Sequence, residues 1–431
     1  MSPTPASPPT PTPQTLAQKL VARAAGRVQV QPGEIVDCAV DLAMFHDSSG
    51  PRRLQPMLAE LGAEIWDRSK VVLVMDHYVG EVDDDSRRIV DIARTWAVEQ
   101  RLPHVHDSEG ICHVLLPERG HLRPGLFCVG GDSHSPTGGA FGAFMFGIGS
   151  TEMLGVLVSG RIWLQVPRTL RYRWDGSLSP GVYAKDMMLH TIGRFGLNGA
   201  GYQAAEFAGE AVRALPMAER MTLCNMAAEL GAMVGLVAPD AVTSAWLRAV
   251  GVDGADIEAW QGDEDAPLLA EHVFDAAALS PQVARPHSPA DAHAVGELAG
   301  QPITIAYIGA CTGAKLHDLR AAAAVLRGKR VARGVQLMLA PASLREQRQA
   351  QDEGTLQVLL DAGASLLPIG CGACAGYGSR FADGSRVIAS TARNFRGRMG
   401  GQGVEVFLAS PATVAASALH GSIADPRELL A

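Results

Sequence analysis

The chain has 431 residues, of which 47% are hydrophobic and 19% charged, and its formal net charge is −8. This composition is typical of a soluble, well-packed protein of two or three domains, and no apolar stretch is long enough to span a membrane. The negative charge argues against a nucleic-acid or anionic-membrane partner bound through overall charge, although a few arginines can still form a pocket for a small anion.

The first 14 residues, MSPTPASPPTPTPQ, are rich in Pro, Ser and Thr, which predicts a disordered tail over 1–14. They contain no apolar core and no Arg, so neither a secretory nor a mitochondrial signal is recognisable. The chain has seven cysteines, an odd number in a long chain. A secreted protein held together by disulfides typically has an even number of cysteines in a short chain. We therefore expect a cytoplasmic protein with reduced thiols.

Beyond the tail, a helix is expected at 15–26, and short apolar runs then alternate with Ala-rich helical segments such as 315–328. Ser343 with Glu346 indicates a capping box at the start of another helix. The apolar runs are continuous rather than alternating, as in buried, mostly parallel strands of α/β proteins. The expected strands are 71–75, 125–130, 303–309, 335–340, 364–370 and 386–390.

The length and the order of these elements predict two or three α/β domains. Composition changes at 167–182 and 281–301 indicate linkers between them. Reactive residues follow five of the expected strands, and ligands of open α/β sheets bind beyond the carboxyl ends of strands. We therefore expect one shared site that contains Asp76-His77, Asp132-Ser133-His134, Cys311, Cys371, and Arg393 with Arg398.

Three cysteines give the strongest chemical signal, because Cys311 ends one apolar run and Cys371 and Cys374 form a Cys-x-x-Cys pair after another. Three thiolates are one fewer than a closed zinc site or an electron-transfer cluster uses. They suit an iron–sulfur cluster with one open iron, which acts as a Lewis acid. The glycines of 370–378 could direct backbone N–H groups at such an anion. Buried cysteines serving as small hydrophobes, or zinc with a fourth ligand, remain alternatives.

Other motifs are compatible with a binding site. The glycine-rich segment 130–153 lacks the Gly-Lys-Ser/Thr ending of a phosphate loop and the G-x-S-x-G elbow of a hydrolase. Its polar triplet 132–134 is costly to bury without a ligand, which favours binding over a plain turn. Asp76 could raise the pKa of His77 and favour a protonated acid, unless the pair is a surface turn. The arginines of 391–399 could grip a carboxylate.

In their order along the chain, these motifs are similar to those of the aconitase superfamily, specifically its large subunits of the 3-isopropylmalate dehydratase and homoaconitase type. The resemblance extends from about residue 15 to 431. It implies three α/β domains around a shared cleft, without the swivel domain, which we place at 15–166, 167–297 and 298–431. The matching segments are DLAMFHD (41–47), VMDHYV (74–79), GDSHSPTGGAFGAFMFGIGSTE (131–152), MTLCNMAAELGA (221–232), IGACTGAKLHDLRAA (308–322), GCGACAG (370–376), STARNFRGRMG (390–400) and LASPATVAASALHGSIADP (408–426).

The resemblance also implies roles for individual residues. A [4Fe–4S] cluster would be held by Cys311, Cys371 and Cys374, and His77, oriented by Asp76, would protonate the departing hydroxyl. The other implied site residues are Asp132, His134 and Glu229 around the iron-bound oxygen, Asn225 as the hydrogen-bond partner of the cluster, and His46, Ser133, Arg393 and Arg398 as substrate-binding residues.

The activity implied by the resemblance is that of a hydro-lyase or isomerase for a 2-hydroxy di- or tricarboxylate, such as 3-isopropylmalate, homocitrate, homoaconitate or a substituted malate. The catalytic serine and an arginine would come from a separate small subunit. A cluster-sensing, RNA-binding regulator is an alternative that the acidic balance disfavours, and an inactive scaffold is another. Three departures from the family pattern, Ala310, Gly313 and Ala392, remove polar groups near the expected cluster.

Overall fold

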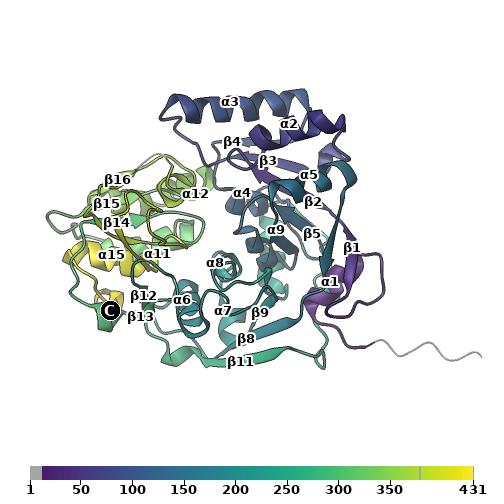
Figure 1. Ribbon diagram of the computed structural model, residues 1–431. Coiled ribbons are helices and arrows are strands. Elements are labelled where there is room, and N and C mark those ends of the chain that lie inside the picture. The colour runs from purple at the N-terminus through teal and green to yellow at the C-terminus, as the bar shows by residue number, and fades with distance from the viewer. Residues whose placement is uncertain (1–11, 378–379, 431) are drawn as a thin grey trace, which may run out of the picture.

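The computed structural model describes residues 12–377 and 380–430 and contains three mostly parallel β-sheets (Figure 1). The first sheet, near the top in Figure 1, has the order β4-β3-β2-β5-β6, and each of its neighbouring strand pairs is parallel. Its strands are β2 (Leu42–His46), β3 (Val71–Met75), β4 (His104–Asp107), β5 (Phe127–Gly130) and β6 (Phe144–Gly147). Its helices are α1 (Leu16–Ala24), α2 (Pro51–Leu61), α3 (Asp84–Glu99), α4 (Cys112–Glu118) and α5 (Ser150–Ser159), with 3₁₀ turns η1 (Arg68–Lys70) and η2 (Ser135–Phe141).

An antiparallel ribbon of β1 (Ile35–Ala39) and β7 (Arg161–Gln165) leads to the second sheet, whose order is β10-β9-β8-β11. This sheet is parallel throughout and lies at the bottom in Figure 1. Its strands are β8 (Thr169–Asp175), β9 (Ala204–Ala208), β10 (Val234–Leu236) and β11 (Ala270–Asp275). Its helices are α6 (Ala184–Phe195), α7 (Glu210–Ala214), α8 (Met217–Met226) and α9 (Ala241–Ala249), with 3₁₀ turns η3 (Glu258–Trp260) and η4 (Ala276–Ala278).

The third sheet lies at the left in Figure 1 and has the order β13-β12-β18-β17-β14-β15-β16. The strands from β18 to β16 are parallel, whereas β12 and β13 add antiparallel at one edge. The strands are β12 (Gln282–Ala284), β13 (Ala292–Ala294), β14 (Ile305–Ile308), β15 (Gln336–Leu339), β16 (Ala364–Leu366), β17 (Arg386–Ala389) and β18 (Glu405–Ala409). The helices are α10 (Val295–Leu298), α11 (Leu316–Leu326), α12 (Leu344–Asp352), α13 (Thr355–Asp361), α14 (Gly372–Ala375) and α15 (Pro411–His420), with a final 3₁₀ turn η5 (Pro426–Leu429).

The expected α/β class with mostly parallel sheets is confirmed, and each of the six expected strands contains an observed one. The two expected linkers are wrong, since 167–182 contains β8 and 281–301 contains β12, β13 and α10. β8 is an inner strand of its sheet, hydrogen-bonded to β9 and β11. The division into domains stays a prediction, but the pairing of β12 with β18 favours a third boundary near residue 281 rather than at 297.

Two local expectations also need correction. The predicted disordered tail falls on residues 1–11, which lie outside the described residues, and on 12–14, where Gln14 is buried and its backbone N–H donates to Asp263 at 2.7 Å. Ser343 does cap α12 by accepting from the backbone N–H of Glu346 at 3.1 Å. The side chain of Glu346 does not complete the box, because it accepts from the backbone N–H of Leu316 instead.

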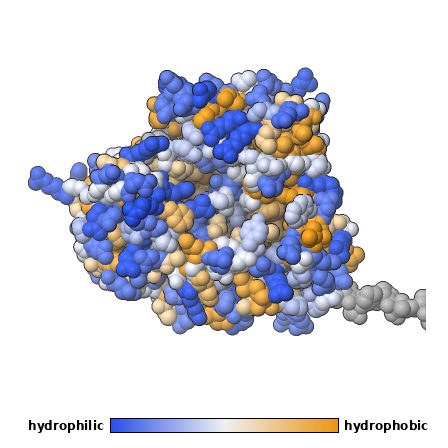
Figure 2. Space-filling view, viewed as in Figure 1, coloured by the Kyte–Doolittle hydropathy of each residue, from blue (hydrophilic) through white to orange (hydrophobic). Residues whose placement is uncertain are grey.

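The apolar core is divided between two clusters of buried side chains. The smaller cluster packs α1, the ribbon and one face of the first sheet, and the larger one extends from the other face of that sheet through the second and third. Figure 2 shows a hollow on the face of the molecule between the part that carries α2 and α3 and the part that carries the third sheet. The backbone N–H of Cys371, beyond β16 of the third sheet, donates to the carbonyl of Asp76, beyond β3 of the first, so the carboxyl ends of these two strands lie close together.

Candidate active site

Residues after the strand ends are brought together by direct contacts between segments that are distant in the chain. Asp76 and His77 follow β3, and the backbone carbonyl of Asp76 accepts from the backbone N–H of Cys371, which follows β16. Asn225, near the end of α8, donates from its Nδ2 atom to the Cys311 sulfur at 3.2 Å. The first, second and third sheets therefore all contribute to one site.

His77 lies between a carboxylate and a thiol. Its Nδ1 atom is 2.7 Å from Asp76 Oδ1, and the other Asp76 oxygen accepts from the backbone N–H of Cys112 at 2.7 Å. Burial alone would lower the pKa of the His77 imidazole, but the charges of Cys371 and Asp76 outweigh it and raise the pKa well above its usual value. The Asp76 contribution does not depend on what the thiol binds. An imidazole held in its protonated form is suited to act as a general acid.

The polar triplet after β5 forms a second cluster of acids and imidazoles. One Asp132 oxygen is 2.7 Å from His113 Nε2 and accepts from the backbone N–H of His134 at 2.8 Å. The other Asp132 oxygen lies 3.6 Å from Nε2 of His46, whose ring stacks on that of His77 with centroids 3.8 Å apart. Burial would raise the pKa of Asp132, but the hydrogen bonds from the surrounding imidazoles hold it well below its usual range, so this group is a carboxylate.

Glu229 links the second sheet to Arg393, which follows β17 of the third. Its Oε1 atom lies 2.9 Å from His134 Nε2 and accepts from Arg393 Nε at 2.5 Å. Burial would raise the pKa of Glu229, but His134 and Arg393 lower it, and Glu229 in turn raises the pKa of His134 despite burial. The bond through Nε leaves the two terminal nitrogens of Arg393 for another anion. The second Glu229 oxygen is buried without a hydrogen-bond partner among the described residues.

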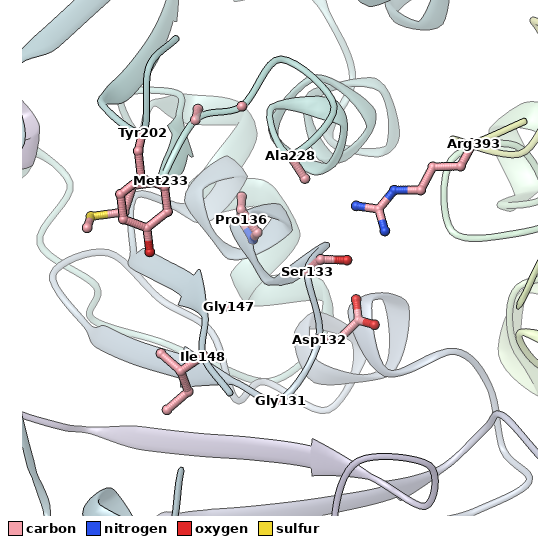
Figure 3. Close-up of a pocket in the computed structure, with 12 residues that line it drawn as sticks. Gly131, Asp132, Ser133, Pro136, Gly147, Ile148, Tyr202, Ala228, Met233 and Arg393 are labelled. Carbon is pink, nitrogen blue, oxygen red and sulfur yellow. The ribbon is translucent and has the colours of Figure 1, made fainter. Parts of the chain in front are cut away.

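Figure 3 shows how part of this cluster borders a pocket. The side chains of Asp132, Ser133 and Arg393 point toward one another at one end, and Tyr202 and Met233 lie at the other. The pocket has a volume of about 390 Å³, which is enough for a small carboxylic acid. A positive guanidinium beside a hydroxyl suits one carboxylate group of such an acid.

The three expected cysteine ligands lie near one another. Burial, together with repulsion from the Cys371 and Cys374 charges, raises the pKa of the Cys311 thiol well above its usual value. Cys371 is the N-cap of α14 and Cys374 lies within that helix, so the pair is presented on one short turn. Thiols in such surroundings lose their protons when a metal ion compensates their charge. These thiols could hold a metal centre. Two other groups of the site also have ligand atoms within 4.8 Å of one another, namely His46, Asp47, Asp76 and His77, and His113, Asp132 and His134.

Arg398 lies beside this cysteine turn, because its backbone carbonyl packs against Gly376 and leaves no room for a β-carbon there. Its Nε atom is buried without a hydrogen-bond partner among the described residues. A buried guanidinium nitrogen of this kind is available to an anionic ligand. The structure therefore brings every expected site residue into the region of the strand ends.

Three residues of the site were missed from the sequence. His113 contacts Asp132, as described above, and Asp47 accepts from the backbone N–H groups of His77 and Tyr78 at 3.2 and 2.9 Å. Lys185, on α6, donates to oxygens next to Cys311 and Arg393. Asp47 follows β2, a strand that was not among the expected ones, so the strand-end argument did not reach it. His113 and Lys185 lie on helices with no local motif.

Comparisons with known proteins identify the family of the chain. The model of the aconitase family (aconitate hydratase) matches residues 18–421. The 3-isopropylmalate dehydratase large subunit 1 of Methanopyrus kandleri is 44% identical over 97% of this chain and 100% of its own length. The probable methanogen homoaconitase large subunit of Methanothermobacter thermautotrophicus is 39% identical over 96% of this chain and 97% of its own.

A solved structure supports the fold. The holo-form crystal structure of Thermococcus kodakaraensis aconitase X superposes with a TM-score of 0.50 at 13% identity, covering 83% of this chain and 84% of that one. Among the described residues, no helix has the length and apolar character needed to cross a membrane. These relatives are similar to the chain over nearly its whole length, and together with the family match they establish its family. The chain belongs to the aconitase family of hydro-lyases.

Proposed function

We propose that this chain is the large, cluster-bearing subunit of a [4Fe–4S]-dependent hydro-lyase that dehydrates and rehydrates a 2-hydroxy di- or tricarboxylate. Its substrate would be 3-isopropylmalate, homocitrate or homoaconitate, or a substituted malate. The relatives are named 3-isopropylmalate dehydratase and homoaconitase, which favours the first of these types. The proposal rests on the side-chain contacts of the thiols. Asn225 donates to Cys311, and His77 lies against Cys371 with Asp76 behind it.

The residues present fit the proposed cluster. Asn225 Nδ2 is a side-chain donor aimed at the Cys311 sulfur, which is the kind of hydrogen bond that tunes clusters. Cys311, Cys371 and Cys374 would hold three irons and leave a fourth without a protein thiolate. When bound, the cluster would supply a Lewis acid that withdraws charge from the hydroxyl and carboxylate of the substrate.

The chain's own residues supply binding and proton transfer. Arg393 and Arg398 would bind substrate carboxylates, with Ser133 and His46 beside them. His77, kept protonated by Asp76, would donate a proton to the departing hydroxyl. Asp132, His134 and Glu229 form a hydrogen-bonded set that would fix the orientation of that hydroxyl and of the Arg393 guanidinium. Burial of these groups strengthens their electrostatic effects.

The base that removes the carbon-bound proton is proposed to come from a separate small subunit. The relatives are named large subunits, which implies a partner in their assemblies. A serine and an arginine of that partner would complete the site and exclude water from it. The chain alone would then bind substrate but turn it over slowly.

The test is anaerobic purification of this chain with and without its co-expressed small subunit, followed by a screen of malate-type acids. We expect a brown, iron-containing complex that forms an unsaturated acid, detected by its ultraviolet absorbance. We also expect the chain alone to be nearly inactive with an intact chromophore. Turnover by the single chain at about 1 per second or faster would disprove the need for a partner base. An iron-free, colourless complex with full activity would disprove the cluster.

A further inference from the structure

Lys185 is a buried cation that the reaction described above does not use. It lies in the first turn of α6 with 1% of its surface exposed. Its Nζ atom has three oxygen neighbours at hydrogen-bond distance: Thr312 Oγ1 at 3.1 Å, the Ser390 carbonyl at 2.6 Å and the Thr391 carbonyl at 2.7 Å. A helix of the second sheet therefore reaches the strand ends of the third.

The three neighbours show that the Lys185 side chain is a protonated ammonium group. The two carbonyl oxygens can only accept hydrogen bonds. The Thr312 hydroxyl uses its own hydrogen to donate to the Ser390 carbonyl at 2.9 Å, so it too accepts from Lys185. Three acceptors require three N–H donors, which an ammonium has and a neutral amine lacks. The geometry thus fixes a positive charge at this buried position.

No carboxylate is in direct contact with this charge. Within 12–377 and 380–430, no Asp or Glu oxygen lies within 4.0 Å of the Lys185 nitrogen. The nearby buried Lys315 also donates to the Cys311 carbonyl, at 3.0 Å, but it differs from Lys185 because its Nζ atom is 2.9 Å from Asp318 Oδ2. A buried charge without a counter-charge is expensive, and protein structures rarely retain one unless a ligand or metal centre supplies the opposite charge.

The surroundings of Lys185 indicate where that opposite charge belongs. Thr312 directly follows Cys311, and Ser390 and Thr391 directly precede the Ala392–Arg393 turn. Burial lowers the pKa of Lys185 to about 8, whereas the charges of Asp318, Cys311 and Cys374 act to raise it. A cluster held by three thiolates is anionic, and its net charge and environment set its reduction potential.

We propose that Lys185 is the resident counter-cation of the iron–sulfur cluster and a positioning residue for the loops that hold it. This inference rests on the proposed cluster. Without the ammonium, the anionic cluster loses its electrostatic compensation, so it becomes easier to oxidise and loses iron faster. When the ammonium is present, it holds the loop after Cys311 and the loop before Arg393 together through its bonds to Thr312 and Thr391.

The test compares three variants of the full chain, co-expressed with the small subunit and loaded anaerobically. Lys185→Met removes the charge at similar volume, and Lys185→Arg keeps the charge. The matched control is the double variant Arg171→Met with Glu206→Gln, which removes a part-buried ion pair between β8 and β9 without changing net charge. The readouts are the reduction potential of the cluster, the rate of iron loss in air, and melting temperatures of iron-loaded and iron-free protein.

We expect Lys185→Met to have a more negative potential than wild type and to lose iron about tenfold faster, in the range found for groups that support metal ligands. Lys185→Arg and the double control are expected to keep a potential near that of wild type. The melting temperature of Lys185→Met is expected to fall more in the iron-loaded than in the iron-free protein, since only the loaded form has an anion to compensate.

Two results would overturn the inference in distinguishable ways. If iron-loaded Lys185→Met keeps the wild-type potential and rate of iron loss, or loses equal stability with and without iron, Lys185 is only a structural clamp and the counter-cation role is wrong. If wild type itself takes up no iron, the proposed cluster fails, and the counter-cation role fails with it.

Discussion

Replacing Asp76 by Asn tests what controls the proton on His77. Both carboxylate oxygens of Asp76 are used, one by His77 Nδ1 and the other by the backbone N–H of Cys112, each at 2.7 Å. An amide has one oxygen. If that oxygen keeps the bond from Cys112, the NH₂ group faces His77 Nδ1 and favours an imidazole without a proton there. The variant therefore disfavours the charged ring without changing the size of the side chain.

The size of the effect follows from the bond that is lost. A hydrogen bond to a charged group contributes about 1.5–3 kcal/mol, and about 1.4 kcal/mol corresponds to one pKa unit. The pKa of His77 is thus expected to fall by about 1–2 units. Because His77 acts in its protonated form, lowering its pKa moves the alkaline limb of the activity profile to lower pH. At a fixed alkaline pH the variant is expected to be about 10–100-fold slower, with near-normal rates on the acid side.

The assay is the pH dependence of kcat/KM for the complex with the small subunit. Asp47→Asn is the matched control, since Asp47 is also buried but lies 3.8 Å from His77 Nδ1 and accepts mainly from backbone N–H groups. We expect a smaller shift in that variant. An alkaline limb that stays at the wild-type pH in Asp76→Asn would show that Asp76 does not hold the proton on His77.

Three further outcomes are expected. Cys311→Ser is expected to lose the brown chromophore and the iron, measured by visible absorbance and iron assay. Cys128→Ala, in the buried strand β5, is expected to keep both. Full iron retention by Cys311→Ser would contradict the ligand assignment. Gly313→Ala places a β-carbon 2.3 Å from the Ser390 side chain. The free energy of unfolding, measured with denaturant, is therefore expected to fall by about 1–3 kcal/mol. Unchanged stability would disprove the packing argument. Arg393→Lys loses the Nε bond to Glu229 and is expected to raise KM about tenfold or more in steady-state kinetics, while an unchanged KM would exclude the substrate-binding role.

Much of the fold could be predicted because buried parallel strands have a simple sequence signature. The expected strand 71–75 coincides with β3, whose five residues are all buried. The signature fails for β8, because charged residues alternate along this strand. The composition change at 167–182 was therefore interpreted as a linker. Arg171 of β8 is paired with Glu206 of β9 at 2.8 Å, and Arg173 lies 3.5 Å from Glu271 of β11. These partners are on other strands, so a local reading of composition cannot include them.

The same limit applies to the site. Residues at strand ends could be predicted, since the carboxyl ends of parallel strands meet at one edge of a sheet. His113 and Lys185 come from helices α4 and α6, and their contacts bridge 19 and 127 or more positions of sequence. A single histidine or lysine in an amphipathic helix carries no local signal. Only the packing of the helices identifies them as part of the site.

The packing also accounts for one of the three departures from the family pattern. Gly313 lies against Ser390, whose hydroxyl accepts from the backbone N–H of Gly309 at 3.0 Å and lies 3.1 Å from the Gly313 carbonyl. A polar side chain at 313 would occupy the space of this serine. Ala310 adopts a left-handed backbone conformation, with φ of 71°, where a larger side chain would add strain.

With small residues at 310, 313 and 392, fewer side chains are left to stabilise charge near the cysteines. Within the described chain, Asn225 is the side-chain N–H donor to the Cys311 sulfur, and Lys185 is the buried cation beside it with no carboxylate in direct contact. Both are on helices of the second sheet, whereas the cysteines are on the third. The potential and stability of the proposed cluster would therefore depend on how firmly α6 and α8 are held against the third sheet. The loss of Lys185 would then affect this chain more than a relative that keeps polar residues at those three positions.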